Sequence, residues 1–193
     1  MLIEEQTTND PVIKWALEQA TSLLSPLGNR WLHVQGVVKQ AQRVSKMFDK
    51  NDQAYLIASA YLHDIGYAPS IEKTGFHPLD GAYYLQSHSQ SRLASLVAYH
   101  SEPQFEAELR GLSTELEKFP REHSIVADTL TYCDITTSST GQRVTLEERI
   151  ADILRRYRET DIVTQALQQA IPLWEADIKR TEQKLLEHGL TKS

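Results

Sequence analysis

The chain has 193 residues, 40% of them hydrophobic, which is enough to bury one sizeable core. Its formal net charge is −6 and its lysines and arginines form no basic stripe, so we expect no binding to a nucleic-acid polymer. A single cysteine excludes an internal disulfide, residues 1–10 lack the apolar core of a signal peptide, and no apolar run reaches the ~20 residues of a bilayer span. We therefore expect a cytoplasmic protein with one domain over residues 1–193 and no membrane contact, and its oligomeric state stays open.

The first two predicted helices carry apolar residues at helical spacing. Asp10-Pro11 is typical of a helix start, and the apolar stripe that follows breaks at Pro26. A second helix is predicted from about residue 30 to 48. His33 lies at the edge of its valine-rich face, where a polar side chain can reach the core.

The third predicted helix starts near residue 51 and ends on the adjacent pair His63 and Asp64. Both side chains follow apolar residues on their own helical faces, so both are expected to point inward. A buried carboxylate requires a proton, a cation or a metal ion as a partner. The pair alone also fits a hydrogen-bonded couple that ties the helix end to a loop. Gly66 is expected to end the helix and to leave room for a ligand.

The middle of the chain adds two histidines to helical segments. A loop over residues 67–76 contains Lys73, and His77 precedes the proline that opens the next helix. His100 closes the apolar stripe of the helix after that. Residues 102–120 keep only an irregular helical spacing, which predicts an irregular excursion there.

A helix over about residues 121–136 places Asp134 on an apolar face, with Cys133 beside it as a small core residue. The carboxylate is therefore expected inside the protein, like Asp64.

The C-terminal part also has a helical pattern. Thr145 and Glu148 form a capping box for a helix that ends near residue 157. A long last helix over about residues 161–188 is expected to kink at Pro172. Since no window alternates convincingly with period two, the sequence predicts an all-α helical bundle.

Six possible metal ligands come from successive segments, and most of them end or border an apolar stripe: His33, His63, Asp64, His77, His100 and Asp134. A metal site inside a helical bundle requires this shared position. Imidazole and carboxylate ligands suit iron, manganese, zinc or nickel, and cobalt and magnesium remain candidates. Six ligands are too many for one tetrahedral ion and fit two ions bridged by Asp64.

The pattern resembles the HD superfamily of metal-dependent phosphohydrolases, which has a histidine, a His-Asp pair and a later aspartate. The matching residues are His33, His63, Asp64 and Asp134. The resemblance covers residues 30–136, with 144–189 as a helical extension, and it implies an HD-like bundle with a metal site in its core. His77 and His100 resemble the extra histidines of members with two ions, including diadenosine polyphosphate hydrolases and a diiron oxygenase branch.

Two branches of the superfamily fit poorly. Tyr67 stands where a lysine would follow Ile65-Gly66, and no Gly-Tyr-Pro motif comes after it, which argues against the cyclic-dinucleotide phosphodiesterases. The absence of a Glu-Asp pair after Asp64 argues against an alarmone hydrolase.

The resemblance implies hydrolysis of a small phosphorylated substrate, with a nucleotide as the expected class, by a metal-activated water at a site that includes Asp64 as a catalytic residue. Arg30, Lys73 and Arg143 lie near the predicted ligands in the chain and could together neutralise a phosphate. The alternatives are an HD-type diiron oxygenase, which would use similar ligands, and a catalytically silent helical domain that binds a nucleotide or a partner.

Overall fold

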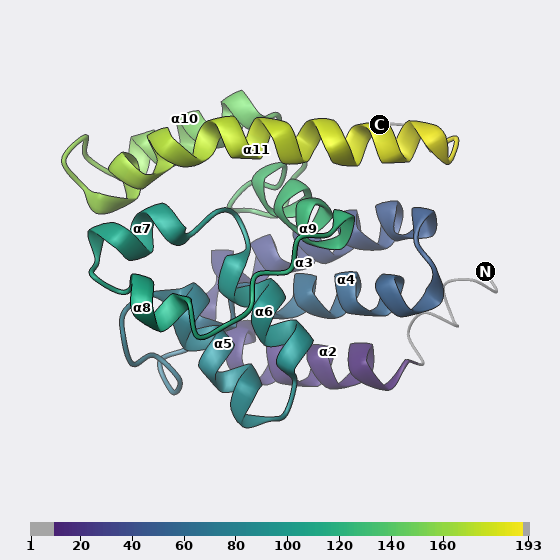
Figure 1. The fold of residues 1–193 in the computed structure, drawn as a ribbon, viewed down its shortest axis with the longest axis horizontal. Coiled ribbons are helices and arrows are strands. Elements are labelled where there is room, and N and C mark those ends of the chain that lie inside the picture. The colour runs from purple at the N-terminus through teal and green to yellow at the C-terminus, as the bar shows by residue number, and fades with distance from the viewer. Residues whose placement is uncertain (1–9, 191–193) are drawn as a thin grey trace.

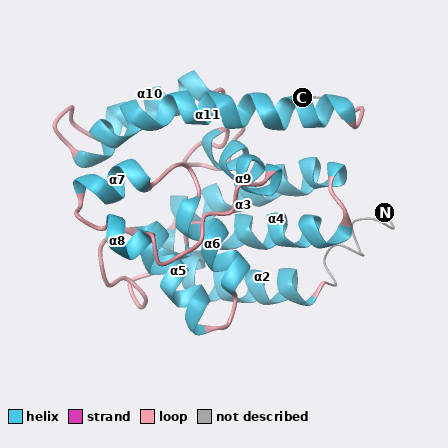
Figure 2. Cartoon of the chain, viewed as in Figure 1, coloured by secondary structure: helices cyan, strands magenta, loops and turns pink. Residues whose placement is uncertain are grey.

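The computed structural model describes residues 10–190, and the part of the N-terminal prediction that concerns residues 1–9 lies outside this range. The described chain is built from helices and loops (Figure 2), which confirms the all-α prediction. Within this range, extended pairing is limited to one isolated bridge between Thr137 and Arg143. None of the described helices combines the length and the apolar character that crossing a membrane demands.

The helices follow the predicted chain order. They are α2 (Pro11–Leu24), α3 (Asn29–Val44), α4 (Lys50–Leu62), α5 (His77–Ser87), α6 (Ser91–Tyr99), α7 (Gln104–Leu109), α8 (Ser113–Leu116), α9 (Ile125–Ile135), α10 (Leu146–Arg156) and α11 (Ile162–Glu187). Three short 3-10 helices lie between them: η1 (Ser25–Leu27), η2 (Ser45–Met47) and η3 (Ile65–Tyr67). The short helices α7 and α8 are the predicted irregular excursion.

Two predicted boundaries were wrong for local reasons. The chain leaves α3 early because it tightens into η2 and then becomes extended at Phe48. The helix predicted from residue 121 starts only at Ile125, because Ser124 is extended and its hydroxyl caps the first turn by accepting from the N–H of Ala127. The capping box of Thr145 and Glu148 is confirmed.

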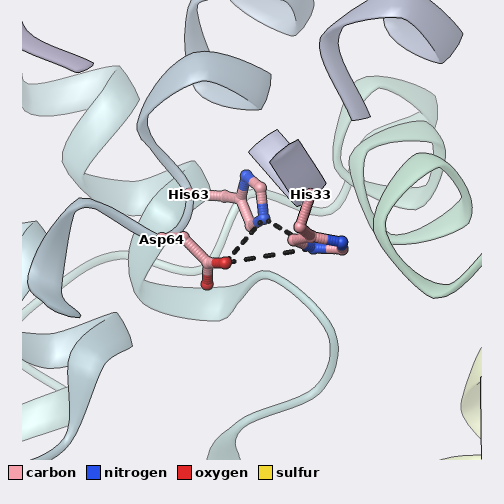
Figure 3. A group of neighbouring side chains, drawn as sticks. All are labelled: His33, His63 and Asp64. Carbon is pink, nitrogen blue, oxygen red and sulfur yellow. Dashed lines mark hydrogen bonds and ion pairs between the residues drawn. The ribbon is translucent and has the colours of Figure 1, made fainter. Parts of the chain in front are cut away.

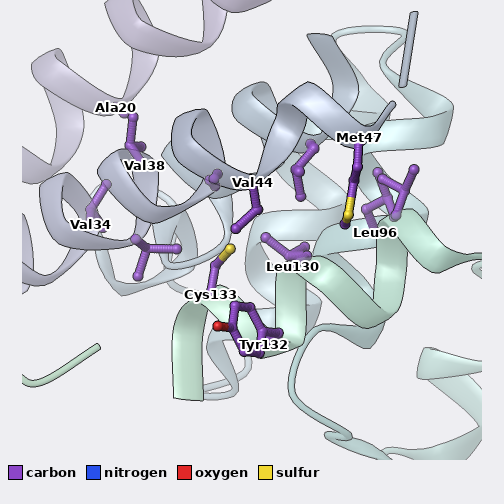
Figure 4. Close-up of a cluster of buried hydrophobic side chains, with 14 of the residues drawn as sticks. Ala20, Val34, Val38, Val44, Met47, Leu96, Leu130, Tyr132 and Cys133 are labelled. Carbon is purple, nitrogen blue, oxygen red and sulfur yellow. The ribbon is translucent and has the colours of Figure 1, made fainter. Parts of the chain in front are cut away.

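The largest core cluster lies where α3, α4 and α9 pack together (Figure 4). Val34 and Val44 of α3 meet Leu130 and Cys133 of α9 there. Cys133 is buried, as predicted for a small core residue, and burial raises the pKa of its thiol. A neutral, enclosed thiol has no nucleophilic role.

The long helix α11 lies across one side of the molecule, where it packs on α9 and α7 (Figure 1). It continues through Pro172 as one helix. A separate apolar cluster joins it to α9 and α10 and contains Ile135, Ile153, Leu167, Ala170 and Trp174. α11 therefore covers the end of α9 that carries Asp134.

Candidate metal centre

The pair His63 and Asp64 lies at the C-terminal end of α4, not inside the helix. α4 ends at Leu62, His63 is its C-cap, and Asp64 precedes η3. Both side chains are almost completely buried, as their positions on the apolar faces predicted. The end of α4 thus delivers two possible ligands to one point in the core.

Gly66 does not end α4 or open space for a ligand, so this prediction was wrong. The residue belongs to η3 and is not among the described glycines with positive φ. A Cβ atom on Gly66 would lie 2.0 Å from the backbone oxygen of His77 and 2.8 Å from the backbone nitrogen of Gly81. The missing side chain therefore lets η3 contact the start of α5, and this contact brings His77 beside Asp64.

The first group of possible ligands is His33, His63 and Asp64 (Figure 3). The Nε2 atoms of the two histidines are 3.4 Å apart, and they lie 3.9 Å and 3.4 Å, respectively, from Oδ2 of Asp64. Oδ1 of Asp134 lies 2.9 Å from Nε2 of His33. The four residues matched to the HD pattern therefore meet at one buried point.

The second group is Asp64, His77 and His100. Nε2 of His77 lies 3.4 Å from Oδ1 of Asp64 and 3.3 Å from Nε2 of His100. The two carboxylate oxygens of Asp64 thus face different histidine groups. This arrangement suits a carboxylate that bridges two metal ions.

Three of the four histidines are oriented by backbone carbonyl oxygens. Nδ1 of His33 donates to the carbonyl oxygen of Ser138 at 3.0 Å. In the same way, Nδ1 of His63 donates to Ala60 at 2.9 Å, and Nδ1 of His100 donates to Val97 at 2.6 Å. Because a carbonyl oxygen can only accept, each Nδ1 carries a proton, and Nε2 faces the site. Metal-binding histidines are commonly fixed in this way, so the donor set fits a metal ion.

The two carboxylates of the site are kept ionised by cationic neighbours. Burial opposes ionisation of Asp64, but Arg30 and His63 outweigh it and hold the pKa of this carboxyl well below its usual value. Burial likewise opposes ionisation of Asp134, and its hydrogen bond with His33 lowers its pKa well below the usual value. Burial opposes a charge on His63, yet Asp64 raises the pKa of its imidazole. Two ionised carboxylates are therefore enclosed together, with Arg30 beside Asp64 and Arg149 beside Asp134.

The histidines of the second group have lowered pKa values, in contrast to His63. Burial lowers the pKa of His77 well below its usual value, and burial followed by the charge of His63 lowers that of His100. Neutral imidazoles keep the lone pair that binding to a metal needs.

Arg30 and Tyr67 cover the carboxylate between the two groups. Nη1 of Arg30 donates to Oδ2 of Asp64 at 2.5 Å, and its guanidinium lies 3.9 Å from the centre of the Tyr67 ring. That ring stacks on His77 with their centroids 4.0 Å apart. Burial raises the pKa of Tyr67, so it is a neutral phenol.

A strained turn supports His100 and Asp134. Ser101 and Glu102 have φ angles of 57° and 58°, which residues with a side chain rarely adopt. The hydroxyl of Ser101 donates to Oδ2 of Asp134 at 2.5 Å, and Nε1 of Trp174 donates to the carbonyl oxygen of Ser101 at 3.0 Å. Such backbone strain persists only where the surroundings hold it. α11 therefore helps to position both metal-site residues.

The site opens into a cavity of about 290 Å³. Its lining includes Arg30, Asp64, His77, His100 and Asp134. Three further arginines line it, Arg110, Arg149 and Arg156, which the sequence reasoning missed. Arg149 and Arg156 share one face of α10, because they are seven residues apart, and this spacing was the available signal.

The structure does not bring Lys73 or Arg143 to this cavity. Lys73 is exposed in the loop before α5. Arg143 lies near the hydroxyl of Tyr132, at 3.3 Å, and lines a different cavity. Tyr132 and Asp134 are two residues apart on α9 and so point to different sides of that helix. Of the three cations predicted to bind the phosphate, only Arg30 lines the cavity that contains the histidines.

Fold and site together define a class: helical proteins with a buried histidine and aspartate cluster that can hold metal ions. The chain belongs to the HD domain family, whose model matches residues 30–158, more than half of its length. The match includes both ligand groups and α10 but ends before α11. Comparisons with curated proteins and with solved structures gave no match.

Proposed function

We propose that this protein is a metal-dependent phosphohydrolase that acts on a small phosphorylated substrate, with a nucleotide as one candidate class. The observation that carries the proposal is the position of Asp64, whose two oxygens face separate histidine groups. Membership of the HD domain family is consistent with such chemistry. The cavity beside the site provides room for a substrate.

The donor set fits one or two divalent ions, held by His33, His63, Asp64 and Asp134 and by Asp64, His77 and His100. When bound, such ions supply a water molecule of lowered pKa and stabilise negative charge on phosphate oxygens. In the hydrolysis, the water oxygen forms a bond to phosphorus while the bond from phosphorus to the ester oxygen breaks. The proton of the water goes to the leaving alcohol, and phosphate is the second product.

The protein's own residues bind and orient the substrate. Arg30 and Arg149 lie beside Asp64 and Asp134, respectively, where they can donate to phosphate oxygens. The side chain of Arg149 is only 11% exposed, so its charge is weakly screened. We assign a catalytic role to Asp64, which would hold the reacting groups together.

The cavity is expected to favour an anionic ligand only when metal ions are bound. The charged side chains in the lining are four arginines and four carboxylates, so their formal charges cancel. The arginines are Arg30, Arg110, Arg149 and Arg156, and the carboxylates are Asp64, Glu102, Glu106 and Asp134. Divalent ions at the histidine groups would make the cavity positive. Binding of a phosphorylated substrate is therefore expected to depend on metal.

The test is release of phosphate, or of a nucleoside monophosphate, from a panel of nucleotides and simple phosphate esters. Each substrate is incubated with manganese, iron, nickel, cobalt, zinc or magnesium. Turnover that disappears with a chelator and in Asp64→Asn supports the proposal.

The five residues of the two ligand groups, with Asp134 beside His33, also suit two irons, which keeps oxygen chemistry as the second candidate. No turnover of any phosphate ester, together with oxygen uptake by the reduced iron form, would favour the oxygenase. Bound metal without either activity would favour a silent binding domain.

A further inference from the structure

The last helix of the chain supplies an apolar part of the cavity lining. Val163, Leu167, Ala170 and Trp174 are spaced along one face of α11, and all four line the cavity. Ile153 of α10 adds to the same part of the lining. We call these five residues the apolar wall. Since the family match ends at residue 158, most of this wall lies outside the matched residues.

The apolar wall is packed against the rest of the protein. Four of its members, Ile153, Leu167, Ala170 and Trp174, belong to the cluster that joins α11 to the rest of the protein. The indole N–H of Trp174 is also bound to the carbonyl oxygen of Ser101. An apolar surface of this kind is suited to an apolar group of a ligand, because the surface is already ordered before binding.

A partly buried arginine on α10, Arg149, joins the apolar wall to the metal site. Nη2 of Arg149 lies 3.5 Å from Oδ1 of Asp134, and Ile153 follows one helical turn later. The Nε atom of Arg149 is buried without a hydrogen-bond partner. Buried donors are normally paired, so a ligand oxygen that reaches this N–H would supply the missing partner.

We propose that the substrate is a phosphate monoester with one small apolar group, aromatic or aliphatic, which α11 recognises through the apolar wall. The phosphate binds beside Arg30 and Arg149, and the organic group contacts Leu167, Ala170 and Trp174. This inference rests on the proposed function for the role of the phosphate. A cavity of about 290 Å³ is just below the ~300–1,000 Å³ usual for ligand sites, which suits a single small organic group.

The experiment measures binding, so it does not depend on turnover. The purified protein, with its metal content known, is titrated by calorimetry with phenylphosphonate and with methylphosphonate, which share the anionic group and resist hydrolysis. We expect phenylphosphonate to bind about tenfold more tightly, because only its ring can contact the apolar wall.

Two variants alter the apolar wall. Ala170→Phe fills the space that the ring would occupy, and Val163→Gln makes the wall polar at a half-buried position where folding is less at risk. Both should reduce the preference for phenylphosphonate to about threefold or less while methylphosphonate binds as before. The matched control is Gln169→Phe, which places the same side chain at an exposed position of α11.

The outcomes separate this inference from the proposed function. If the protein hydrolyses phosphate esters but binds both phosphonates equally, or binds neither, the inference is overturned and the function stands. If it prefers phenylphosphonate, loses the preference in Val163→Gln and releases no phosphate from any ester, the binding inference stands and the function fails. An unchanged preference in both wall variants, with circular dichroism showing that they fold, would also overturn the inference.

Discussion

Oδ1 of Asp64 lies 3.4 Å from Nε2 of His77, although the two residues belong to different elements, one before η3 and one at the start of α5. The other oxygen of Asp64 faces His33 and His63. A single carboxylate therefore connects the two possible metal positions. The consequences can be tested one residue at a time.

Asp64→Asn should remove most of the bound metal at both positions, because the amide lacks the charge that two cations share. Elemental analysis of protein purified without added metal measures this loss. The control is Asp80→Asn, which changes another buried carboxylate, one that accepts hydrogen bonds from Thr74 and belongs to neither ligand group. Full metal content in Asp64→Asn would show that the ligand assignment is wrong.

The double variant His77→Ala, His100→Ala should lose one metal ion and keep the other. His33, His63, Asp64 and Asp134 remain close together without these two side chains. Elemental analysis should therefore give about one ion per chain, if the parent holds two as a bridged site does. The exposed His88 provides the control variant His88→Ala. Two ions in the double variant would rule out the second position.

Gly66→Ala should destabilise the fold by about 2–4 kcal/mol, because the new methyl group would overlap the backbone of His77 and neither backbone can easily move. Urea denaturation measures the free energy of unfolding. Gly81→Ala is the matched control, since its methyl group meets mainly side chains, at 3.1 Å and 3.2 Å, and should cost less. Equal effects of the two substitutions would contradict the role given to Gly66.

Arg149→Ala should lower kcat/KM about tenfold to a hundredfold, since losing a charge-assisted contact to phosphate costs ~1.5–3 kcal/mol. Arg143→Ala should have little effect, because Arg143 lines another cavity. Steady-state kinetics with the best phosphate ester compares them. Metal content is measured in parallel, because Arg149 also lies near Asp134. A larger loss of kcat/KM in Arg143→Ala than in Arg149→Ala would show that Arg143 is the residue that binds the substrate.

Asp177 of α11 should make stability depend on pH. Burial first, and then the charges of Asp128 and Glu102, raise the pKa of this carboxyl to about 7, although Arg180 and Arg121 oppose the shift. The folded state therefore binds this proton more tightly than the unfolded state, whose value is about 3.9. Its contribution to stability is present below pH 4 and is lost as the pH rises towards 7.

Asp177→Asn cannot ionise, so its free energy of unfolding should rise relative to the parent between pH 5 and pH 8. Between these pH values the relative gain is at most about 3 kcal/mol, since the folded-state pKa of about 7 lies two units above pH 5, and the lost ion pair with Arg180 reduces it. Urea denaturation at the two pH values measures the difference, with the exposed Glu175→Gln as control. If the free energy of unfolding of Asp177→Asn relative to the parent stayed constant or fell with pH, the raised pKa of Asp177 would be contradicted.

Local sequence patterns were sufficient for the helices and for the family. Apolar periodicity places His33, His63 and Asp134 on buried faces, and the order of the ligands gives the HD resemblance that the family match confirms. The buried faces depend on residues close together in the chain, because a helical face repeats every few positions, and the order of the ligands can be read along the chain without knowledge of the fold.

Only the tertiary structure decided which side chains meet. Three features join separate elements of the chain: the contact of Gly66 with His77, the approach of Arg149 to Asp134, and the wall that α11 adds to the cavity. Arg149 and Arg143 are similar in the sequence, since each is a cation soon after Asp134, yet only one reaches the cavity. The difference lies in the path of the chain after α9 and in the packing of α10 and α11, which no local pattern specifies.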